Sequence, residues 1–339
     1  MCSAGGGHAR YIEALRREIA LQRSFFAPGE TIRTLYFGGG TPSQLSREEF
    51  GAVCSALRGG FDLAALEEFT VEVNPEDIVQ QPALAGFYRE CGVDRVSMGV
   101  QSFCDSHLKW MNRRHSAAAA REAFGILRAA GFGNISIDLI FGYEGLSKQQ
   151  WKYNLQQAVA LAPEHISAYQ MSIDEESALW HLAESGRYRE PEQEVCAEQY
   201  ALLQETLEAA GYLQYEISNF ARPGFCSRHN SAYWAREPYL GLGAAAHSFN
   251  GSDLRFWNPA SVERYCAALE GGVLPTEGSE RLGEREIYNE RVMLGLRTVR
   301  GVEKNLVPAG GVLQEAGERL RIPRSKLFIC DSIIESYLK

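Results

Sequence analysis

Closely spaced cysteines are missing from this sequence. Its eight cysteines stand apart from one another, the nearest two being Cys91 and Cys104, and no CxxC or CxxxC occurs. Zinc sites and iron–sulfur clusters usually draw their ligands from such short motifs. The sequence therefore carries no local signature of a metal site, and we expect free thiols, several of them buried as small hydrophobic side chains.

Long apolar runs and an excess of basic residues are absent as well. No segment approaches the ~20 apolar residues of a membrane-spanning helix, and the start, Met1–Gly7, lacks the basic and apolar stretches of a signal peptide. Lysine and arginine number 34 against 43 aspartate and glutamate, a net charge of −9, which argues against a nucleic-acid-binding face. We therefore expect a cytoplasmic globular protein without a nucleic-acid partner.

What is present is an alternation of strand-like and helix-like segments. Apolar residues recur at helical spacing in a first helix at Tyr11, Leu15 and Ile19, and further helical patterns cover Ala119–Ala130 and Trp151–Ala162. Five β-rich segments are predicted as strands: Thr31–Phe37, Phe69–Val73, Arg95–Val100, Ile135–Phe141 and His165–Met171. This order indicates an α/β fold with a parallel sheet, either a partial barrel or an open sheet, because five strands are too few for an eight-stranded barrel.

The pattern changes after about residue 175. A charged helical stretch covers Glu192–Ala210, a segment rich in aromatic residues, histidine and glycine covers Tyr212–Trp257, and the end looks mostly helical. We therefore predict three regions: a barrel-like part at 1–175, a middle region at 176–280 and a small, mostly helical domain at 281–339.

The sharpest local feature is the run Gly38–Pro42, a triple glycine followed by Thr and Pro directly after the first predicted strand. Glycines at such a position allow a ligand to approach backbone N–H groups. The run is neither a Walker A loop nor a GxGxxG motif. Taken alone, it fits a ligand-binding loop and a tight strand–helix turn equally well.

Two carboxylates, Glu72 and Asp138, stand within predicted strands of mostly apolar residues. Buried carboxylates are costly unless they are paired or functional. A carboxylate at a strand end can bind a ribose diol or an ammonium group, although a structural ion pair or a solvent-facing position explains it too. Gln101 and Arg113 are ordinary polar residues when taken by themselves.

One short segment, His229–Trp234, places an imidazole beside two aromatic rings, and His247 follows in a glycine-rich stretch. Histidine can ligate iron axially, and aromatic rings can face a porphyrin. A single histidine also serves often as a hydrogen-bonded structural residue, and both interpretations stay open on this pattern alone.

Taken together, these segments resemble the HemW branch of the oxygen-independent coproporphyrinogen oxidase-like radical-SAM proteins. The resemblance extends from about Tyr11 to the C-terminus, and it rests on nine motifs in order: YFGGGTPS, VEVNPED, RVSMGVQSF, DLIFG, HISAYQ, YEISNFARPG, HNSAYW, GLGAAAHSF and NERVMLGLRT.

The resemblance implies a fold and two sets of binding residues. The implied fold is a partial (βα)6 barrel of the radical-SAM type, here lacking its first strand, with a smaller C-terminal α/β-to-helical domain. Contacts to S-adenosylmethionine (SAM) are implied at Gly39, Gly40, Thr41, Glu72, Gln101, Arg113, Asp138 and Ser172. Contacts to heme are implied at His229, Asn230, Tyr233 and Trp234.

The sequence departs from the family at its start. The family carries a first strand and a CxxxCxxC loop ahead of the first helix, whereas here only Met1–Gly6 precede that helix, with Cys2 as at most a remnant. One thiolate cannot hold a four-iron cluster. We therefore predict that this chain holds no [4Fe–4S] cluster and cannot cleave SAM. We favour a truncated sequence over a shortened, cluster-free relative.

The resemblance leaves three hypotheses for function. The first is a heme chaperone that binds heme and passes it to acceptor proteins, touching membranes at most peripherally through those acceptors. The second is an enzyme, an oxygen-independent coproporphyrinogen III oxidase of porphyrin biosynthesis. The third is a fragment without function. The region that would separate the first two, the cluster motif, is not in the sequence.

Overall fold

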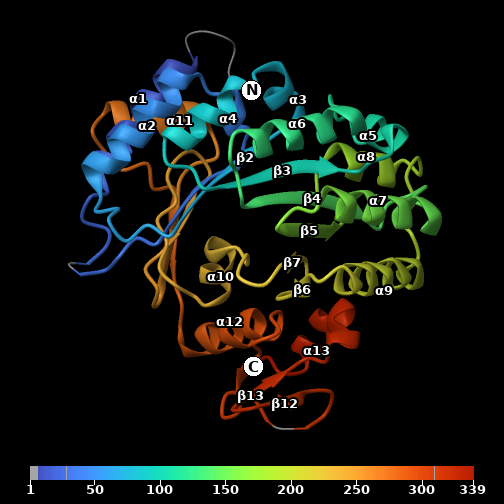
Figure 1. The fold of residues 1–339 in the computed structure, drawn as a ribbon. Coiled ribbons are helices and arrows are strands. Elements are labelled where there is room, and N and C mark those ends of the chain that lie inside the picture. Colours follow the sequence, from blue (N-terminus) through green and yellow to red (C-terminus); the bar gives the residue numbers. More distant parts are fainter. Residues whose placement is uncertain (1–6, 28, 309) are drawn as a thin grey trace.

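The computed structural model describes residues 7–27, 29–308 and 310–339 of the chain. Cys2 and the rest of residues 1–6 lie outside this range. Within it, helices and strands alternate over the first part of the chain, as the sequence predicts (Figure 1).

Five parallel strands form the centre of the fold, at the five places where the sequence predicts them. They pair in chain order through parallel ladders from β1 to β5, and the β3–β4 ladder shifts register between Met98 and Gln101. Their bounds are β1 (Thr34–Phe37), β2 (Glu68–Val73), β3 (Arg95–Gln101), β4 (Ile135–Phe141) and β5 (His165–Gln170). The predicted partial barrel is therefore confirmed, and β1 begins at Thr34 rather than at Thr31.

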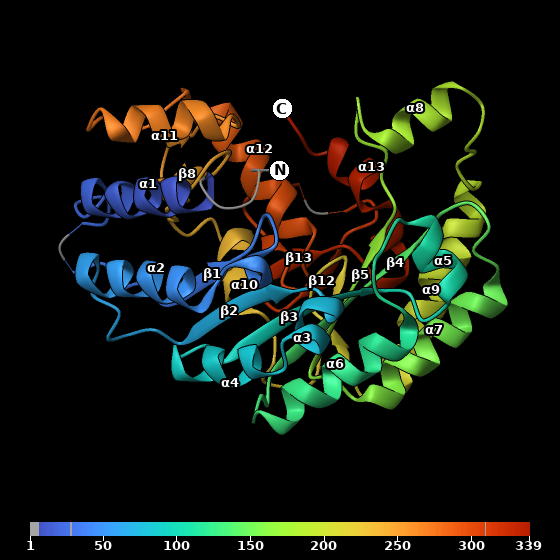
Figure 2. The same ribbon diagram turned by 90° about the horizontal axis from the view of Figure 1, so that it is seen from above.

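The helices that connect these strands lie on one side of the sheet (Figure 1) and follow its curve (Figure 2). Ser46 and Glu49 form a capping box at the start of α2, and Ser147 and Gln150 form another at the start of α7. The bounds are α1 (Gly7–Leu21), α2 (Arg47–Gly60), α3 (Pro75–Gln80), α4 (Ala83–Glu90), α5 (Asp105–Trp110), α6 (Ala117–Ala129) and α7 (Lys148–Leu161). A short 3₁₀ helix, η1 (Pro42–Gln44), precedes α2.

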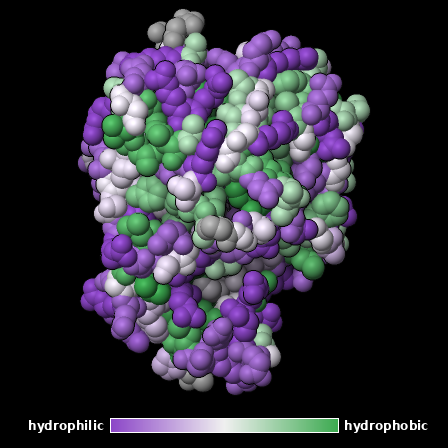
Figure 3. All heavy atoms as spheres, turned by 90° about the vertical axis from the view of Figure 1, so that its left-hand side faces the viewer, coloured by the Kyte–Doolittle hydropathy of each residue, from purple (hydrophilic) through white to green (hydrophobic). Residues whose placement is uncertain are grey.

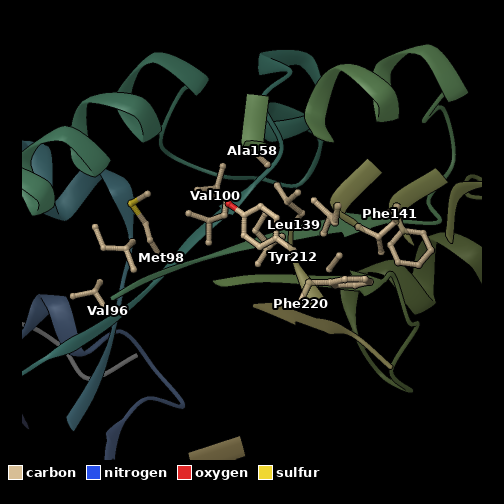
Figure 4. Packing of buried hydrophobic residues seen from close by; sticks show 14 of the residues in the cluster. Val96, Met98, Val100, Leu139, Phe141, Ala158, Tyr212 and Phe220 are labelled. Carbon is tan, nitrogen blue, oxygen red and sulfur yellow. The ribbon is translucent and has the colours of Figure 1, made fainter. Parts of the chain in front are cut away.

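The two faces of the parallel sheet differ in polarity because successive side chains of a strand point to opposite faces. The face toward the helices is apolar and buried from β2 to β5, and Figure 4 shows Val96, Met98 and Leu139 packed there. The opposite face carries polar groups such as Ser97, whose hydroxyl donates to Asp138. Polar chemistry is therefore confined to the concave side of the sheet.

Two short antiparallel strands, not predicted from the sequence, extend the sheet beyond β5. These are β7 (Asn219–Ala221), which pairs with β5, and β6 (Leu213–Gln214), which pairs with β7. They follow α8 (Ala178–Glu184) and α9 (Gln193–Ala209). At the other end of the sheet, β1 has no second partner strand among the described residues.

The remaining chain adds two small antiparallel sheets and several helices below the main sheet and beside α1 (Figure 1). The middle part contains α10 (Arg228–Trp234), β8 (His247–Phe249), β9 (Leu254–Trp257), α11 (Val262–Glu270) and β10 (Gly278–Arg281). The end contains α12 (Glu284–Leu296), β11 (Val302–Glu303), β12 (Gln314–Ala316), β13 (Arg319–Arg321), η2 (Arg324–Ile329) and α13 (Cys330–Glu335). The C-terminal region thus combines the predicted helices with three short strands.

A buried carboxylate fastens α1 to the middle part of the chain. Glu18 accepts hydrogen bonds from the backbone N–H of Gly243 (2.8 Å), the amide of Asn258 (2.6 Å) and the hydroxyl of Tyr265 (2.6 Å). Burial raises the pKa of Glu18, although these three donors work against that shift. The N-terminal helix is therefore held in place by polar contacts as well as by its apolar stripe.

Of the helices in the described part of the chain, none combines the length and the apolar character needed to cross a bilayer. Figure 3 views the side of the molecule that carries α1 and α2, where hydrophobic residues gather between hydrophilic ones.

Candidate functional site

The glycine run after β1 is built around the carboxylate of Glu72. One oxygen of Glu72 accepts from the hydroxyl of Tyr36 (2.6 Å), and the other accepts from the backbone N–H of Gly39 (3.2 Å). A Cβ on Gly38 would lie 2.4 Å from the Tyr36 ring and 2.7 Å from the Glu72 carboxyl carbon, so only glycine fits there. Gly39 adopts a φ of +76°, and nothing lies within 4 Å of a Cβ built on Gly39 or Gly40. The glycine loop is therefore held in place by Tyr36 and Glu72, whereas space for a ligand remains beside Gly39 and Gly40.

Two further predicted residues occupy the neighbouring strands. Asp138 on β4 accepts from Ser97 (3.4 Å), and burial raises its pKa to about 6, with nearby Glu72 adding to the rise and a hydrogen bond from Ser167 opposing it. Gln101 ends β3 with a φ of 63°. Polar groups of β2, β3 and β4 therefore meet on the concave face, toward the carboxyl ends of the strands, where ligands bind in α/β folds.

The remaining residues predicted to contact SAM have fewer contacts with these polar side chains of the strands. Arg113 follows α5 and is exposed, and Ser172 follows β5 and is exposed too. Among the described residues, no hydrogen bond or ion pair links either side chain to Glu72 or Asp138. Thr41 precedes η1 without a side-chain cap bond.

The histidine motif forms helix α10, and its first turn is anchored to the parallel sheet. Ser227 caps the helix by accepting from the backbone N–H of Asn230 (3.2 Å). Glu68, the first residue of β2, accepts from the backbone N–H groups of Arg228 (2.8 Å) and His229 (3.1 Å). A carboxylate is favourable at this end because the helix N-terminus carries partial positive charge.

The imidazole of His229 is enclosed by three side chains. Its ring stacks on Tyr36 with centroids 4.7 Å apart and planes at 16°, and it meets Tyr233 edge-on at 4.9 Å. The Thr34 hydroxyl lies 3.0 Å from its Nδ1. Burial lowers the pKa of His229 to about 4, although the charge of Glu68 opposes the shift. The ring is therefore neutral at pH 7, the form in which histidine ligates a metal ion.

A cavity of about 1500 Å³ is lined by part of each group of predicted residues. Five predicted SAM contacts do not line it: Glu72, Gln101, Arg113, Asp138 and Ser172. Its walls include α1, the whole unpaired edge of β1, the glycine loop and α10. The predicted residues that line it are Gly39, Gly40, Thr41, His229, Asn230 and Tyr233. This volume exceeds the ~300–1,000 Å³ of ordinary small-molecule sites. The cavity therefore has room for a large ligand beside the unpaired edge of β1.

Trp234 does not belong to the cavity wall. The other residues of α10 from Arg228 to Tyr233 do line it, so Trp234 is the one predicted heme contact that the cavity wall lacks. The cavity is also lined by His247, which stacks on Trp257 with centroids 5.8 Å apart.

A ligand set for a metal cluster does not appear in the described range, 7–27, 29–308 and 310–339. No three His, Cys, Asp or Glu side chains gather there in a way that could hold a metal ion. No disulfide joins the cysteines in that range, and the neighbouring thiols of Cys54 and Cys91 share a hydrogen bond. These residues do not fit a four-iron cluster, and Cys2 lies outside them.

Comparison with known proteins places the chain in a family. The profile of the Radical SAM superfamily matches residues 2–158. A protein of Mycobacterium tuberculosis described as "Heme chaperone HemW" is 34% identical over 345 residues, covering 97% of this chain and 86% of that protein. A Bacillus subtilis protein of the same description is 34% identical over 296 residues, covering 87% of this chain and 77% of that protein.

This chain belongs to the HemW family. The resemblance drawn from the nine motifs is thereby confirmed, since the similarity extends over nearly the whole length.

A solved structure supports the fold of this HemW-family chain. It is the coproporphyrinogen III oxidase HemN from Escherichia coli, a radical SAM enzyme, with a TM-score of 0.79 and 21% identity over 97% of this chain and 83% of that one. At this identity the likeness concerns the fold alone.

Three residues of the HemW-family site are not found by sequence reasoning: Thr34, Tyr36 and Glu68. Each contacts His229 or its backbone from a position some 160 to 195 residues earlier in the chain. The sequence offered one signal, the acidic residue Glu68 directly before the predicted strand Phe69–Val73, because a carboxylate that becomes buried there needs a partner.

Proposed function

We propose that this chain is a heme chaperone, which binds heme in the cavity beside α10 and passes it to acceptor proteins in the cytoplasm. The observation that carries the proposal is the neutral imidazole of His229 in the wall of a cavity of about 1500 Å³. A porphyrin needs a large cavity with aromatic surface, and its iron needs an axial ligand such as imidazole.

The cavity wall suits such a ligand. Tyr36 and Tyr233 supply rings next to His229, and Leu15 of α1 lines the same cavity. Asn230 contributes an amide to the wall. In this arrangement His229 would ligate the iron, Tyr233 would pack against the macrocycle, and Asn230 would offer a hydrogen bond, while Trp234 is proposed as a further heme contact on the family resemblance alone.

We further propose that SAM, where it binds, occupies the strand ends. Glu72, Gln101 and Asp138 would face its ribose and amino groups, Gly39, Gly40 and Thr41 would contact it through the open glycine loop, and Arg113 and Ser172 would approach from their exposed loops. The open space around Gly39 and Gly40 supports this assignment. Since the described residues do not fit the family's [4Fe–4S] cluster, we assign no reaction to SAM here.

The chaperone proposal is preferred to the oxidase alternative because of the relatives. Proteins described as heme chaperones are 34% identical to this chain, whereas the oxidase HemN is 21% identical.

A transfer experiment tests the proposal. The chain is loaded with one equivalent of heme and mixed with increasing concentrations of apomyoglobin, and the Soret band is followed in time. We expect the transfer rate to increase with apomyoglobin concentration, because a chaperone hands over its ligand in a complex with the acceptor. A rate independent of apomyoglobin concentration means that heme merely dissociates, and that result rejects a chaperone function.

A further inference from the structure

We propose that Thr34 is a positioning residue that holds the Nδ1–H tautomer of His229, so that Nε2 carries the lone pair that binds iron. The identity of the metal rests on the proposed function, whereas the tautomer itself does not. Neutral imidazole has one nitrogen that donates and one that accepts. A hydroxyl can take either role toward Nδ1, and the proposal assigns the Thr34 hydroxyl the role of acceptor, which leaves the lone pair on Nε2.

The contacts of the His229 ring point to this assignment. The Thr34 hydroxyl lies 3.0 Å from Nδ1, and Nε2 has no hydrogen-bond partner among the residues that the structure describes. His229 lines the cavity, so the nitrogen left without a protein partner belongs to a side chain that a ligand can reach.

One pair of opposite residues on neighbouring strands holds both the backbone and the ring of His229. Thr34 of β1 stands directly opposite Glu68 of β2 in the parallel ladder. Glu68 accepts from the backbone N–H of His229 (3.1 Å), while Thr34 contacts its imidazole (3.0 Å). The backbone and the imidazole of His229 are therefore each held by one of these two paired residues of the sheet.

Tyr36 restricts the rotation of the His229 imidazole. It lies two residues after Thr34, on the same face of β1, and stacks on the imidazole at 16°. Its hydroxyl donates to Glu72 (2.6 Å), which holds the Tyr36 ring in place. Rotation of the imidazole out of this plane would break both the stacking and the Thr34 contact, and a 180° flip would break the Thr34 contact.

A hydroxyl partner has a chemical consequence for the ligand. A carboxylate that accepts from Nδ1–H makes imidazole a stronger iron ligand, since it draws the proton and adds negative charge to the ring. A neutral hydroxyl does this less. Thr34 therefore orients His229 without making it a strong donor, which suits a protein that must release its heme.

The test compares Thr34→Val, Thr34→Ser and the control Thr31→Val. Valine keeps the β-branched shape but cannot accept a hydrogen bond, serine restores the hydroxyl, and Thr31 is exposed and lines the same cavity without a contact to His229. Nitrogen-15 NMR of histidine-labelled, heme-free chain reports the tautomer of His229, with the signal assigned by its loss in His229→Ala.

We expect the wild type, Thr34→Ser and Thr31→Val to show protonated Nδ1 at His229, and Thr34→Val to show a mixture of tautomers. A wild-type ring protonated at Nε2, or a Thr34→Val spectrum equal to the wild type, overturns the proposal whether or not heme binds. In heme titrations, Thr34→Val should lower affinity about two- to tenfold, the effect of one hydrogen bond, and Thr34→Ser should restore it. A wild type that shows the Nδ1–H tautomer but binds no heme rejects the chaperone function alone.

Discussion

Replacing His229 by alanine is expected to weaken heme binding about tenfold or more, which corresponds to a loss of at least ~1.4 kcal/mol. The substitution removes the proposed axial ligand and the ring that stacks on Tyr36 and meets Tyr233. The measurement is a titration with ferric heme followed by Soret absorbance, together with the shift of the band that reports axial ligation.

The matched control is His181→Ala, because His181 is exposed on α8 and does not line the cavity. It should bind heme like the wild type. Equal affinities and equal spectra for the wild type and His229→Ala would remove His229 from the site, and the second cavity histidine, His247, would then be the residue to test.

The pH dependence of binding follows from the same residue. Protons compete with iron for imidazole, and burial lowers the pKa of His229 to about 4, an effect that Arg95 strengthens and Glu68 opposes. Affinity should therefore stay level from pH 8 to about 5 and fall below that, whereas an exposed histidine would begin to lose iron near its ordinary pKa of ~6.5. A fall centred near pH 6.5 would contradict a buried His229 ligand.

The second prediction with a large expected effect is that this chain does not cleave SAM. After incubation with iron, sulfide and dithionite, the 339-residue chain should produce no 5′-deoxyadenosine from SAM above a control without protein. The residues that the structure describes gather no three metal-ligating side chains, and a four-iron cluster cannot be held by one thiolate. Liquid chromatography with mass spectrometry measures the product.

A Cys2→Ala variant of this chain serves as the matched control for cleavage, since Cys2 is the cysteine nearest to the family's cluster motif. Product formation by the wild-type chain would contradict the prediction. If Cys2→Ala then abolished it, Cys2 would be a cluster ligand together with cysteines from elsewhere.

The parallel sheet was predictable because its strands are apolar and long enough to show a pattern. The prediction for Ile135–Phe141 coincides with β4, and the others differ from the structure mainly at their ends. The strands β6 and β7 were not predicted, since two or three residues are too few to show an alternation. Their place is decided by the free edge of β5, which a local pattern does not reveal.

The candidate site was predictable only in part. Glu72 and Gly39 stood out as a carboxylate within a strand and a glycine after one, and the structure joins them by a hydrogen bond of 3.2 Å. The partners of His229 did not stand out, because Thr34 is an ordinary strand residue until the fold brings α10 beside β1. Trp234, which the resemblance also implies as a heme contact, does not line the cavity, and its role stays a prediction.

Heme binding by the purified chain is the measurement that tests the account most directly. Ferric heme is titrated into a folded sample, the Soret band is recorded, and iron is assayed on the sample before heme is added. We predict a saturable shift at close to one heme per chain in protein that contains no iron beforehand. A sample that melts cooperatively but shows no saturable shift would contradict a heme site in the described cavity, and with it the proposed function of this chain.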